Sequence, residues 1–432
     1  MYVQDCLDTA PNGHLTIGGA DTVELANTYG TPLYVMDEAT IRENCRQYKR
    51  SMEQHYGDRG LVCYASKAFS CKEIYRIMAS EGMGIDVVSH GELYTAMSVG
   101  FPADRIVYHG NNKTQTEIEA ALDYGVRFLV VDNPTELALL NRIAGEKGMQ
   151  PNILFRIKPG IDAHTHSFVQ TGQIDSKFGF ALENGEAMEA VKQAVSMQHV
   201  KLVGLHCHIG SQIFDISPFE LAAKVMIEFM ARVREETDCE LSYLNLGGGF
   251  GIQYTEDDDP VPYEGYLGPV SKQVEASCKA HAFPVPFIMI EPGRSIVGSA
   301  GITLYTVGGV KTIAGVRTYL SIDGGMTDNP RYALYQSEYE AVVADRAAAP
   351  RDFEVTIAGR CCESGDLIGE HMHIQQAQPG DRIAVLATGA YNYSMASHYN
   401  RVPNPPVVMV KDGKARLIVR GETVEDVARN DL

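Results

Sequence analysis

Short apolar runs of strand-forming residues alternate with longer stretches of helical periodicity along most of the chain. Eight such runs follow one another, at residues 61–66, 84–89, 105–109, 127–132, 152–158, 202–209, 242–247 and 286–291. The intervening residues 134–148 and 217–236 have the spacing of helices, and residues 38–56 predict a charged amphipathic helix before the first run. Eight β–α alternations over about 230 residues favour a closed (β/α)8 barrel over an open doubly wound sheet.

The longest insertion, residues 159–201 between the fifth and sixth runs, is rich in histidine, glycine and polar residues, which suits a loop at the barrel mouth. Beyond residue 297 the pattern changes to strand-like runs separated by glycine and proline turns, at residues 298–307, 318–323, 353–358, 382–386, 407–410 and 414–419. These runs predict an all-β second domain, a β-barrel or β-sandwich, to which the N-terminal residues add strands. We therefore expect a (β/α)8 barrel at residues 37–296 and a β-domain built from residues 1–36 and 297–432.

Composition narrows the function classes. The 432 residues are 45% hydrophobic and 21% charged, which is globular composition, and the net charge of −18 argues against non-specific binding to nucleic acid or to an anionic membrane. We expect no transmembrane segment, because no apolar stretch approaches the ~20 residues needed, and no signal peptide at the N-terminus. The nine cysteines are scattered and form no paired CxxC set, so free thiols in a reducing cytoplasm are the simplest interpretation.

Charged residues and glycines gather at or directly after the eight runs, where a barrel builds its active site. The residues that stand there are Lys67, Asp86, His109, Arg156, His206, His208, Ser211, Gly247, Gly248, Gly249, Glu291, Gly293 and Arg294. Solvated strand ends would not need this density, so the sequence predicts a functional site at this end of the barrel.

Several of these residues also have a purely structural interpretation. Lys67 ends an apolar run, where burial of its stem would lower an ammonium pKa and make the amine a nucleophile, but a lysine can also reach from a strand end into water. His206 and His208 share a strand face and could bind a metal, yet no third ligand has clear spacing, and His208 could be a core histidine. We expect no metal site, and the acidic residues 256–259 predict a solvated loop.

The glycine run 247–249 either supplies backbone amides to an anion or forms a simple tight turn, and Glu291 either serves a ligand or forms a structural ion pair. Taken with Lys67, they suit one cofactor. Pyridoxal phosphate needs a lysine for its aldehyde, a cradle for its phosphate and a group tuned to its ring nitrogen. A carboxylate opposite that nitrogen keeps it protonated, so that the ring becomes the electron sink that a decarboxylation requires.

Longer motifs resemble those of the diaminopimelate decarboxylases, a family in the alanine racemase-like class (fold type III) of pyridoxal-phosphate enzymes. The similar stretches follow the order of the family and cover residues 64–67, 162–166, 171–179, 206–212, 246–251, 291–294, 323–331, 362–364 and 388–391. The resemblance implies a barrel plus a β-domain, bound pyridoxal 5'-phosphate, and an obligate head-to-tail homodimer with shared active sites. It also implies decarboxylation of meso-2,6-diaminopimelate to L-lysine and CO2, the last step of lysine biosynthesis.

The resemblance assigns roles to individual residues. Lys67 resembles the Schiff-base lysine, His208 the residue that stacks on the cofactor ring, and Glu291 the partner of the pyridine nitrogen. The other residues expected at the cofactor are Asp86, Ser211, Gly248, Gly249, Gly293, Arg294 and Tyr391. Those expected at the substrate are Arg294, Arg331, Tyr335, Glu363 and Tyr391. Cys362 and Glu363 resemble residues that reach in from the other subunit, Cys362 as proton donor to the carbanion and Glu363 as partner of the distal ammonium.

Two departures from the family pattern stand out. His90 lies in a Ser-His-Gly-Glu stretch where Ser-Gly-Gly-Glu is expected, which leaves its role open, and Cys361 beside Cys362 is expected to be a bystander. The nearest alternative is a decarboxylase of ornithine, arginine or carboxynorspermidine, whose substrates lack the distal carboxylate that Arg331 would bind. An amino-acid racemase typically tunes the ring nitrogen with arginine, which Glu291 contradicts, and a non-catalytic regulator would have discarded the cofactor residues.

Overall fold

The computed structural model describes residues 2–161 and 176–432, so the motif residues 162–166 and 171–175 lie outside the described residues. The chain divides into two compact units. The barrel unit consists of Asn44–Gly251 and Pro260–Gly293, and the β-rich unit consists of Met1–Glu43, Ile252–Asp259 and Arg294–Leu432. The segment Ile252–Asp259, which the predicted limits include in the barrel, belongs to the β-rich unit, and the limits at residues 37 and 296 stay a prediction.

Eight parallel strands close the barrel, and each coincides with one of the eight predicted runs. They are β5 (Gly60–Ala65), β6 (Gly84–Val87), β7 (Ile106–Tyr108), β8 (Phe128–Val131), β9 (Asn152–Lys158), β11 (Lys201–His206), β12 (Tyr243–Asn245) and β13 (Phe287–Ile290). Pairing of β13 with β5 and of β8 with β9 completes the ring, and the two-residue strand β10 (Phe180–Ala181) adds to β9. The predicted (β/α)8 barrel is confirmed.

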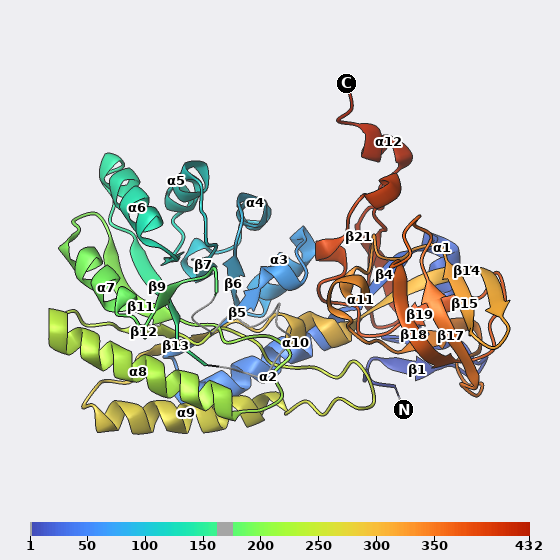
Figure 1. Cartoon of the computed structure of the whole chain (residues 1–432), viewed down its shortest axis with the longest axis horizontal. Coiled ribbons are helices and arrows are strands. Elements are labelled where there is room, and N and C mark those ends of the chain that lie inside the picture. Colours follow the sequence, from blue (N-terminus) through green and yellow to red (C-terminus); the bar gives the residue numbers. More distant parts are fainter. Residues whose placement is uncertain (1, 162–175) are drawn as a thin grey trace. The chain divides into compact units, whose positions relative to one another are not determined.

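Helices follow the strands around the barrel unit (Figure 1). They are α3 (Lys72–Ser80), α4 (His90–Met97), α5 (Gln115–Tyr124), α6 (Pro134–Glu146), α7 (Glu186–Ser196), α8 (Ser217–Thr237) and α9 (Tyr263–Ala280), while α2 (Glu38–Tyr56) precedes β5. Local chemistry fixes their starts: Asn133 caps α6 through the Glu136 amide, and Pro134 occupies the first turn. Inside, Cys63, Phe128, Leu154 and their neighbours pack into a buried cluster, so the barrel is filled and the strand ends carry the polar groups.

A nine-stranded sheet organises the β-rich unit. Its order is β18 (Leu367–Ile374), β17 (Phe353–Ala358), β15 (Arg317–Ile322), β14 (Gly301–Ile313), β4 (Leu33–Asp37), β20 (Val407–Lys411) and β21 (Lys414–Val419), with β19 (Arg382–Val385) joining β14 to β16 (Ala341–Val343). The unit also holds the short helices α1 (Thr22–Tyr29), α10 (Arg294–Val297), α11 (Arg331–Tyr335) and α12 (Val424–Ala428). The predicted sheet-rich second domain is confirmed, although β16 and β18 were not predicted.

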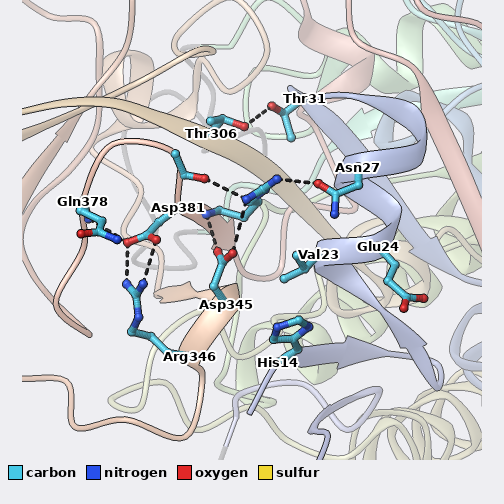
Figure 2. A network of polar contacts seen from close by, with 12 residues as sticks. His14, Val23, Glu24, Asn27, Thr31, Thr306, Asp345, Arg346, Gln378 and Asp381 are labelled. Carbon is cyan, nitrogen blue, oxygen red and sulfur yellow. Dashed lines mark hydrogen bonds and ion pairs between the residues drawn. The ribbon is translucent and has the colours of Figure 1, made fainter. Parts of the chain in front are cut away.

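The N-terminal segment is part of this unit, as predicted. Strand β4 lies between β14 and β20, and β1 (Leu7–Thr9), β2 (Leu15–Ile17) and β3 (Ala20–Asp21) form a separate three-stranded sheet that packs on the same hydrophobic cluster. Polar contacts add to this packing: the hydroxyls of Thr31 and Thr306 lie 2.6 Å apart (Figure 2). In addition, Arg382 donates to Asn27 at 2.5 Å. Within the described ranges, every helix is too short or too polar to cross a membrane.

Candidate active site

Lys67 stands directly after strand β5, where the sequence placed it. The chain leaves β5 through a short 3-10 turn, Ser66–Ala68, in which Ser66 and Ala68 are buried and the side chain of Lys67 is exposed. Of the two interpretations of Lys67 that the sequence left open, its exposure fits a lysine that reaches from the strand end into water, because its two neighbours are the buried residues of the turn. Gly293 packs against this strand end so closely that a Cβ there would lie 2.8 Å from the Cβ of Ala65.

Glu291 follows strand β13 and is only 7% exposed. Its Oε1 accepts two hydrogen bonds of 2.6 Å, one from Nε2 of His109 and one from Nδ2 of Asn245, while Nε2 of His206 lies 3.3 Å from Oε2. The three donors come from the ends of three strands: His109 follows β7, and His206 and Asn245 end the paired strands β11 and β12 on another part of the ring. Oε1 of Glu291 thus has both of its acceptor positions filled, whereas Oε2 accepts one long hydrogen bond and can accept another.

The donors keep this buried carboxyl ionised. Burial by itself would raise the pKa of Glu291, but the electrostatic interactions with His109 and His206 and the hydrogen bonds that these rings donate hold it well below its usual range. The trio of His109, His206 and Glu291 is also the group in the described part of the chain that could hold a metal ion. Nε2 of His109 and Oε1 of Glu291, however, lie 2.6 Å apart, which is a hydrogen-bond distance. Two atoms that bind one tetrahedral zinc are about 3.3 Å apart, so this pair has the spacing of a hydrogen bond.

Asp86 is a second buried acid of the barrel end. It lies in β6 beside Ala65 of β5, is 5% exposed, and its Oδ1 has no hydrogen-bond partner in the described part of the chain. Burial, and then the charge of Glu291, raises the pKa of Asp86 well above its ordinary value, while Lys67 opposes the rise. An unpartnered buried carboxyl oxygen of this kind indicates a place for a polar ligand.

His208 and the glycine run lie in two loops that pack on each other. The Gly248 amide donates to Nδ1 of half-buried His208 at 3.3 Å. Burial, and then the positive charges of Lys67 and Arg156, lower the pKa of His208 well below its usual value, so its ring is neutral. A Cβ on Gly248 would lie 2.1 Å from the carbonyl oxygen of Glu291, so this close approach requires glycine.

The same loops contain two further predicted residues. A Cβ on Gly249, whose φ is +118°, would lie 2.6 Å from the carbonyl oxygen of Gly210, so this position also requires glycine. Ser211 follows Gly210 and is half-buried. The backbone of both loops is therefore brought to the barrel end on which Glu291 stands, as an anion cradle requires.

In the β-rich unit, Arg294 and Arg331 begin helices α10 and α11 and are both buried. The guanidinium carbon of Arg294 lies 4.8 Å from the centroid of the Tyr391 ring, and that of Arg331 lies 6.0 Å from the same centroid. Tyr335 ends α11 and is half-buried. The structure therefore gathers the predicted carboxylate-binding arginines around aromatic rings.

Cys362 and Glu363 are exposed on a loop of the same unit. Buried Asp366 fixes the base of this loop, because its two oxygens accept from the amides of Met326 and Cys361, both at 2.6 Å. Burial, and then Asp366, raises the pKa of the Cys361 thiol to about 11, which disfavours a reactive thiolate and supports its interpretation as a bystander. His90 opens α4 with an exposed side chain and donates its amide to Glu117.

Comparison with known proteins agrees with this geometry. Residues 38–298 match the family described as pyridoxal-dependent decarboxylase, pyridoxal binding domain. A diaminopimelate decarboxylase of Bacillus subtilis (strain 168) is 49% identical over 100% of this chain and 98% of its own, and one of Halalkalibacterium halodurans is 50% identical over 97% and 95%. The chain belongs to the diaminopimelate decarboxylase family. A crystal structure of the M. jannaschii family member in co-complex with L-lysine, 36% identical, superposes with a TM-score of 0.93 over 100% of this chain and 99% of that one.

The family uses pyridoxal phosphate, and the residues of the barrel unit fit that group. Lys67 provides an amine at a strand end, and Glu291 provides an ionised carboxylate whose Oε2 can still accept a hydrogen bond. The glycine cradle, Gly248 and Gly249, has no room for a Cβ at either position. The unpartnered Oδ1 of Asp86 adds a polar atom at the same end. The cofactor expected from the sequence is thus supported by the family and by the donor set.

Several residues that hydrogen-bond or pack against the predicted site residues were not predicted from the sequence. His109 was noted at a strand end without a role, and Asn245 was hidden within an apolar run, where a fully buried amide is itself an unusual signal. Tyr254 and Tyr339, which contact the arginines, and Asp366, which fixes the Cys362 loop, carry no local signal. Their roles depend on contacts between segments far apart in the chain.

The His206 ring predicts a loss of stability in mild acid. Burial lowers the pKa of His206 to about 4, against the opposing effect of Glu291, whereas a histidine in an unfolded chain titrates near 6.5. Between about pH 6.5 and 4 the unfolded chain therefore binds the extra proton, so the free energy of unfolding falls by up to about 1.4 kcal/mol for each pH unit of acidification. His206→Asn is expected to flatten this slope, measured by urea denaturation at pH 7, 6 and 5.

The matched control is His371→Asn, because His371 is an exposed histidine paired with Glu354 on the β-rich unit. Its slope is expected to equal that of the unmodified chain. Identical slopes in all three proteins would contradict the assignment of a neutral buried ring to His206.

Proposed function

We propose that this chain is a pyridoxal-phosphate-dependent decarboxylase that converts meso-2,6-diaminopimelate to L-lysine and CO2, the last step of lysine biosynthesis. Its membership of the diaminopimelate decarboxylase family supports the reaction, and the M. jannaschii relative was crystallised with L-lysine. The single observation that carries the chemistry is the ionised, triply hydrogen-bonded carboxylate of Glu291 at the barrel end. Such a group keeps a pyridine nitrogen protonated.

When bound, pyridoxal phosphate supplies the electron sink for the substrate carbon that loses CO2. Lys67 is proposed to hold the cofactor through its Nζ, and Oε2 of Glu291, the oxygen with acceptor capacity left, to hold the proton at the ring nitrogen. The neutral ring of His208 covers the cofactor face, with Asp86 close to it. The phosphate is proposed to bind the amides of Gly248, Gly249 and Gly293 together with Ser211, Arg294 and Tyr391.

The other groups are proposed to bind the end of the substrate that does not react. Arg294, Arg331, Tyr335 and Tyr391 hold the distal carboxylate, and an arginine fork suits a carboxylate because it can bind both oxygens. Glu363 holds the distal ammonium. The two ends of meso-diaminopimelate carry the same groups with opposite configuration, so a substrate presented with its ends exchanged would place its distal carboxylate or ammonium away from these partners, which gives the site its selectivity.

The protein is further proposed to act as a head-to-tail homodimer in which Cys362 and Glu363 of one subunit complete the site of the other. Their exposure on a loop whose base is fixed by Asp366 supports this arrangement, because the loop presents both side chains to solvent in a single chain. Cys362, or a water that it positions, then delivers the proton to the carbon that lost CO2. A cytoplasmic location is supported by the nine cysteines, all of which are free thiols.

The test is CO2 release from meso-diaminopimelate, L-ornithine, L-arginine and carboxynorspermidine by the purified protein with pyridoxal phosphate. We expect kcat/KM for meso-diaminopimelate to exceed the others by at least about 10²-fold, because the other substrates leave buried arginine charges without a carboxylate. Faster turnover of ornithine or arginine would assign the chain to a different decarboxylase.

A further inference from the structure

Tyr254 occupies an unusual place in the chain. It lies in the segment Ile252–Asp259, which follows the glycine run in sequence but belongs to the β-rich unit. The acidic residues of that segment hold its backbone, since Oδ2 of Asp258 accepts from the amides of Tyr254 at 2.9 Å and of Thr255 at 3.0 Å. The acidic residues 256–259, predicted to form a solvated loop, thus include one aspartate, Asp258, that fixes the backbone of Tyr254. The Tyr254 residue is only 6% exposed.

The ring of Tyr254 contacts both arginines of the proposed carboxylate site. Its hydroxyl accepts a 2.5 Å hydrogen bond from Nη1 of Arg294, and the guanidinium carbons of Arg294 and Arg331 lie 5.6 and 5.0 Å from its centroid. The ring of Tyr339 stands perpendicular to it at 5.4 Å, and the Tyr339 hydroxyl accepts a 2.6 Å hydrogen bond from Nη1 of Arg331. Both arginines thus interact with the Tyr254 hydroxyl, Arg331 also donates to Tyr339, and the two phenols pack edge to face.

Two buried guanidinium groups around one ring repel each other, and aromatic faces and phenol oxygens offset part of that cost. In the described part of the chain, Arg331 has no carboxylate partner, and its side-chain partners are the phenol hydroxyls of Tyr339 and Tyr254. Burial would raise the pKa of Tyr254, yet the charges of Arg294 and Arg331 lower it, which shows how strongly the arginines act on this phenol. The arrangement holds positive charge in place for an anion.

We propose that Tyr254 is a positioning residue for substrate recognition: its ring and hydroxyl fix the guanidinium groups of Arg294 and Arg331 so that both are directed to the distal carboxylate. This proposal rests on the proposed function, which supplies the carboxylate. In this role Tyr254 acts through the two arginines, and its effect is on binding of the end of the substrate that does not react. Tyr339 has the same role for Arg331, to which its hydroxyl is hydrogen-bonded.

The experiment compares two inhibitors that differ in one group. L-Lysine carries the carboxylate that the arginines are proposed to bind, and cadaverine (1,5-diaminopentane) is the same molecule without it. In the unmodified holoenzyme, L-lysine is expected to inhibit meso-diaminopimelate decarboxylation far more strongly than cadaverine. Tyr254→Phe is expected to raise the inhibition constant of L-lysine about tenfold while that of cadaverine stays within about twofold. The variant loses the hydrogen bond that holds the Arg294 guanidinium in place, and only L-lysine has the carboxylate that this guanidinium would bind. KM for meso-diaminopimelate should rise with little change in kcat.

Tyr339→Phe provides a second variant and is expected to give the same selective loss for L-lysine. Tyr266→Phe is the matched control, because Tyr266 is a fully buried tyrosine of α9 whose hydroxyl donates to the carbonyl of Ile213 at 2.8 Å, and it should leave both inhibition constants unchanged. Equal changes for both inhibitors, or none, in the Tyr254 and Tyr339 variants would overturn the positioning role alone. An unmodified enzyme that binds cadaverine as well as L-lysine would overturn the proposed carboxylate recognition and this role together.

Discussion

Replacing Lys67 with alanine is expected to reduce CO2 release by on the order of 10³-fold or more and to remove the visible absorption of bound pyridoxal phosphate. Lys67 is the exposed amine in the turn that ends β5, on the same barrel unit as Glu291 and the glycine cradle. In the proposed site, loss of Lys67 would leave the phosphate contacts of the cofactor in place and remove its covalent attachment. Activity is measured as CO2 release at saturating cofactor, and occupancy by absorbance after desalting.

Lys72→Ala is the control for this change. Lys72 is an exposed lysine five positions further on, in the first turn of α3, so its removal changes the charge of the same region by the same amount. We expect its spectrum and activity to match those of the unmodified protein. A Lys67→Ala protein that keeps the visible band would place the cofactor amine elsewhere and remove the main support for the proposed site.

Glu291→Gln is expected to lower kcat by about 10²–10³-fold while the cofactor still binds. The amide keeps the size of the side chain but carries no charge, so it cannot hold a proton at the pyridine nitrogen. It also turns an N–H group toward His109, Asn245 or His206, where the carboxylate accepted, so stability falls by about 1–3 kcal/mol as well. The decisive measurement is the ¹⁵N chemical shift of the ring nitrogen of labelled cofactor, which reports its protonation directly.

Glu136→Gln is the control that separates the loss of ring-nitrogen protonation from the loss of stability. Glu136 is another buried carboxylate of the barrel unit and pairs with Lys113 at 2.7 Å. This variant is expected to lose stability and to keep the ring-nitrogen shift of the unmodified enzyme. If the ring nitrogen remained protonated in Glu291→Gln, the carboxylate would have a structural role and the proposed electron sink would need another partner.

The barrel could be predicted from the sequence because its strands are apolar runs bounded by turn residues, and because caps such as Asn133 mark where helices begin. Strand β18 was missed because histidines and a glutamate occupy its outward positions, which breaks the apolar pattern. Lys67 and Glu291 stand at strand ends, and the topology of a closed barrel brings such ends together.

The remainder of the site depends on contacts that no local pattern carries. Whether Lys67 is buried depends on how the 3-10 turn distributes its three residues, and the sequence alone left that question open. Asn245 saturates Oε1 of Glu291 because β12 and β13 pair in a particular register. Tyr254 meets two arginines that lie 40 and 77 positions further along the chain, so its role could be found only from the folded structure.

The hydrogen bonds to Glu291 also bear on the order in which the protein is made and loaded. A buried negative charge that depended on a ligand for its partners would make the ligand a requirement for folding. Here His109, His206 and Asn245, all supplied by the chain itself, satisfy that charge. The Glu291 carboxylate therefore does not require the cofactor for its partners, and we expect a shortage of the cofactor to lower the active fraction of the protein without lowering the amount of folded protein.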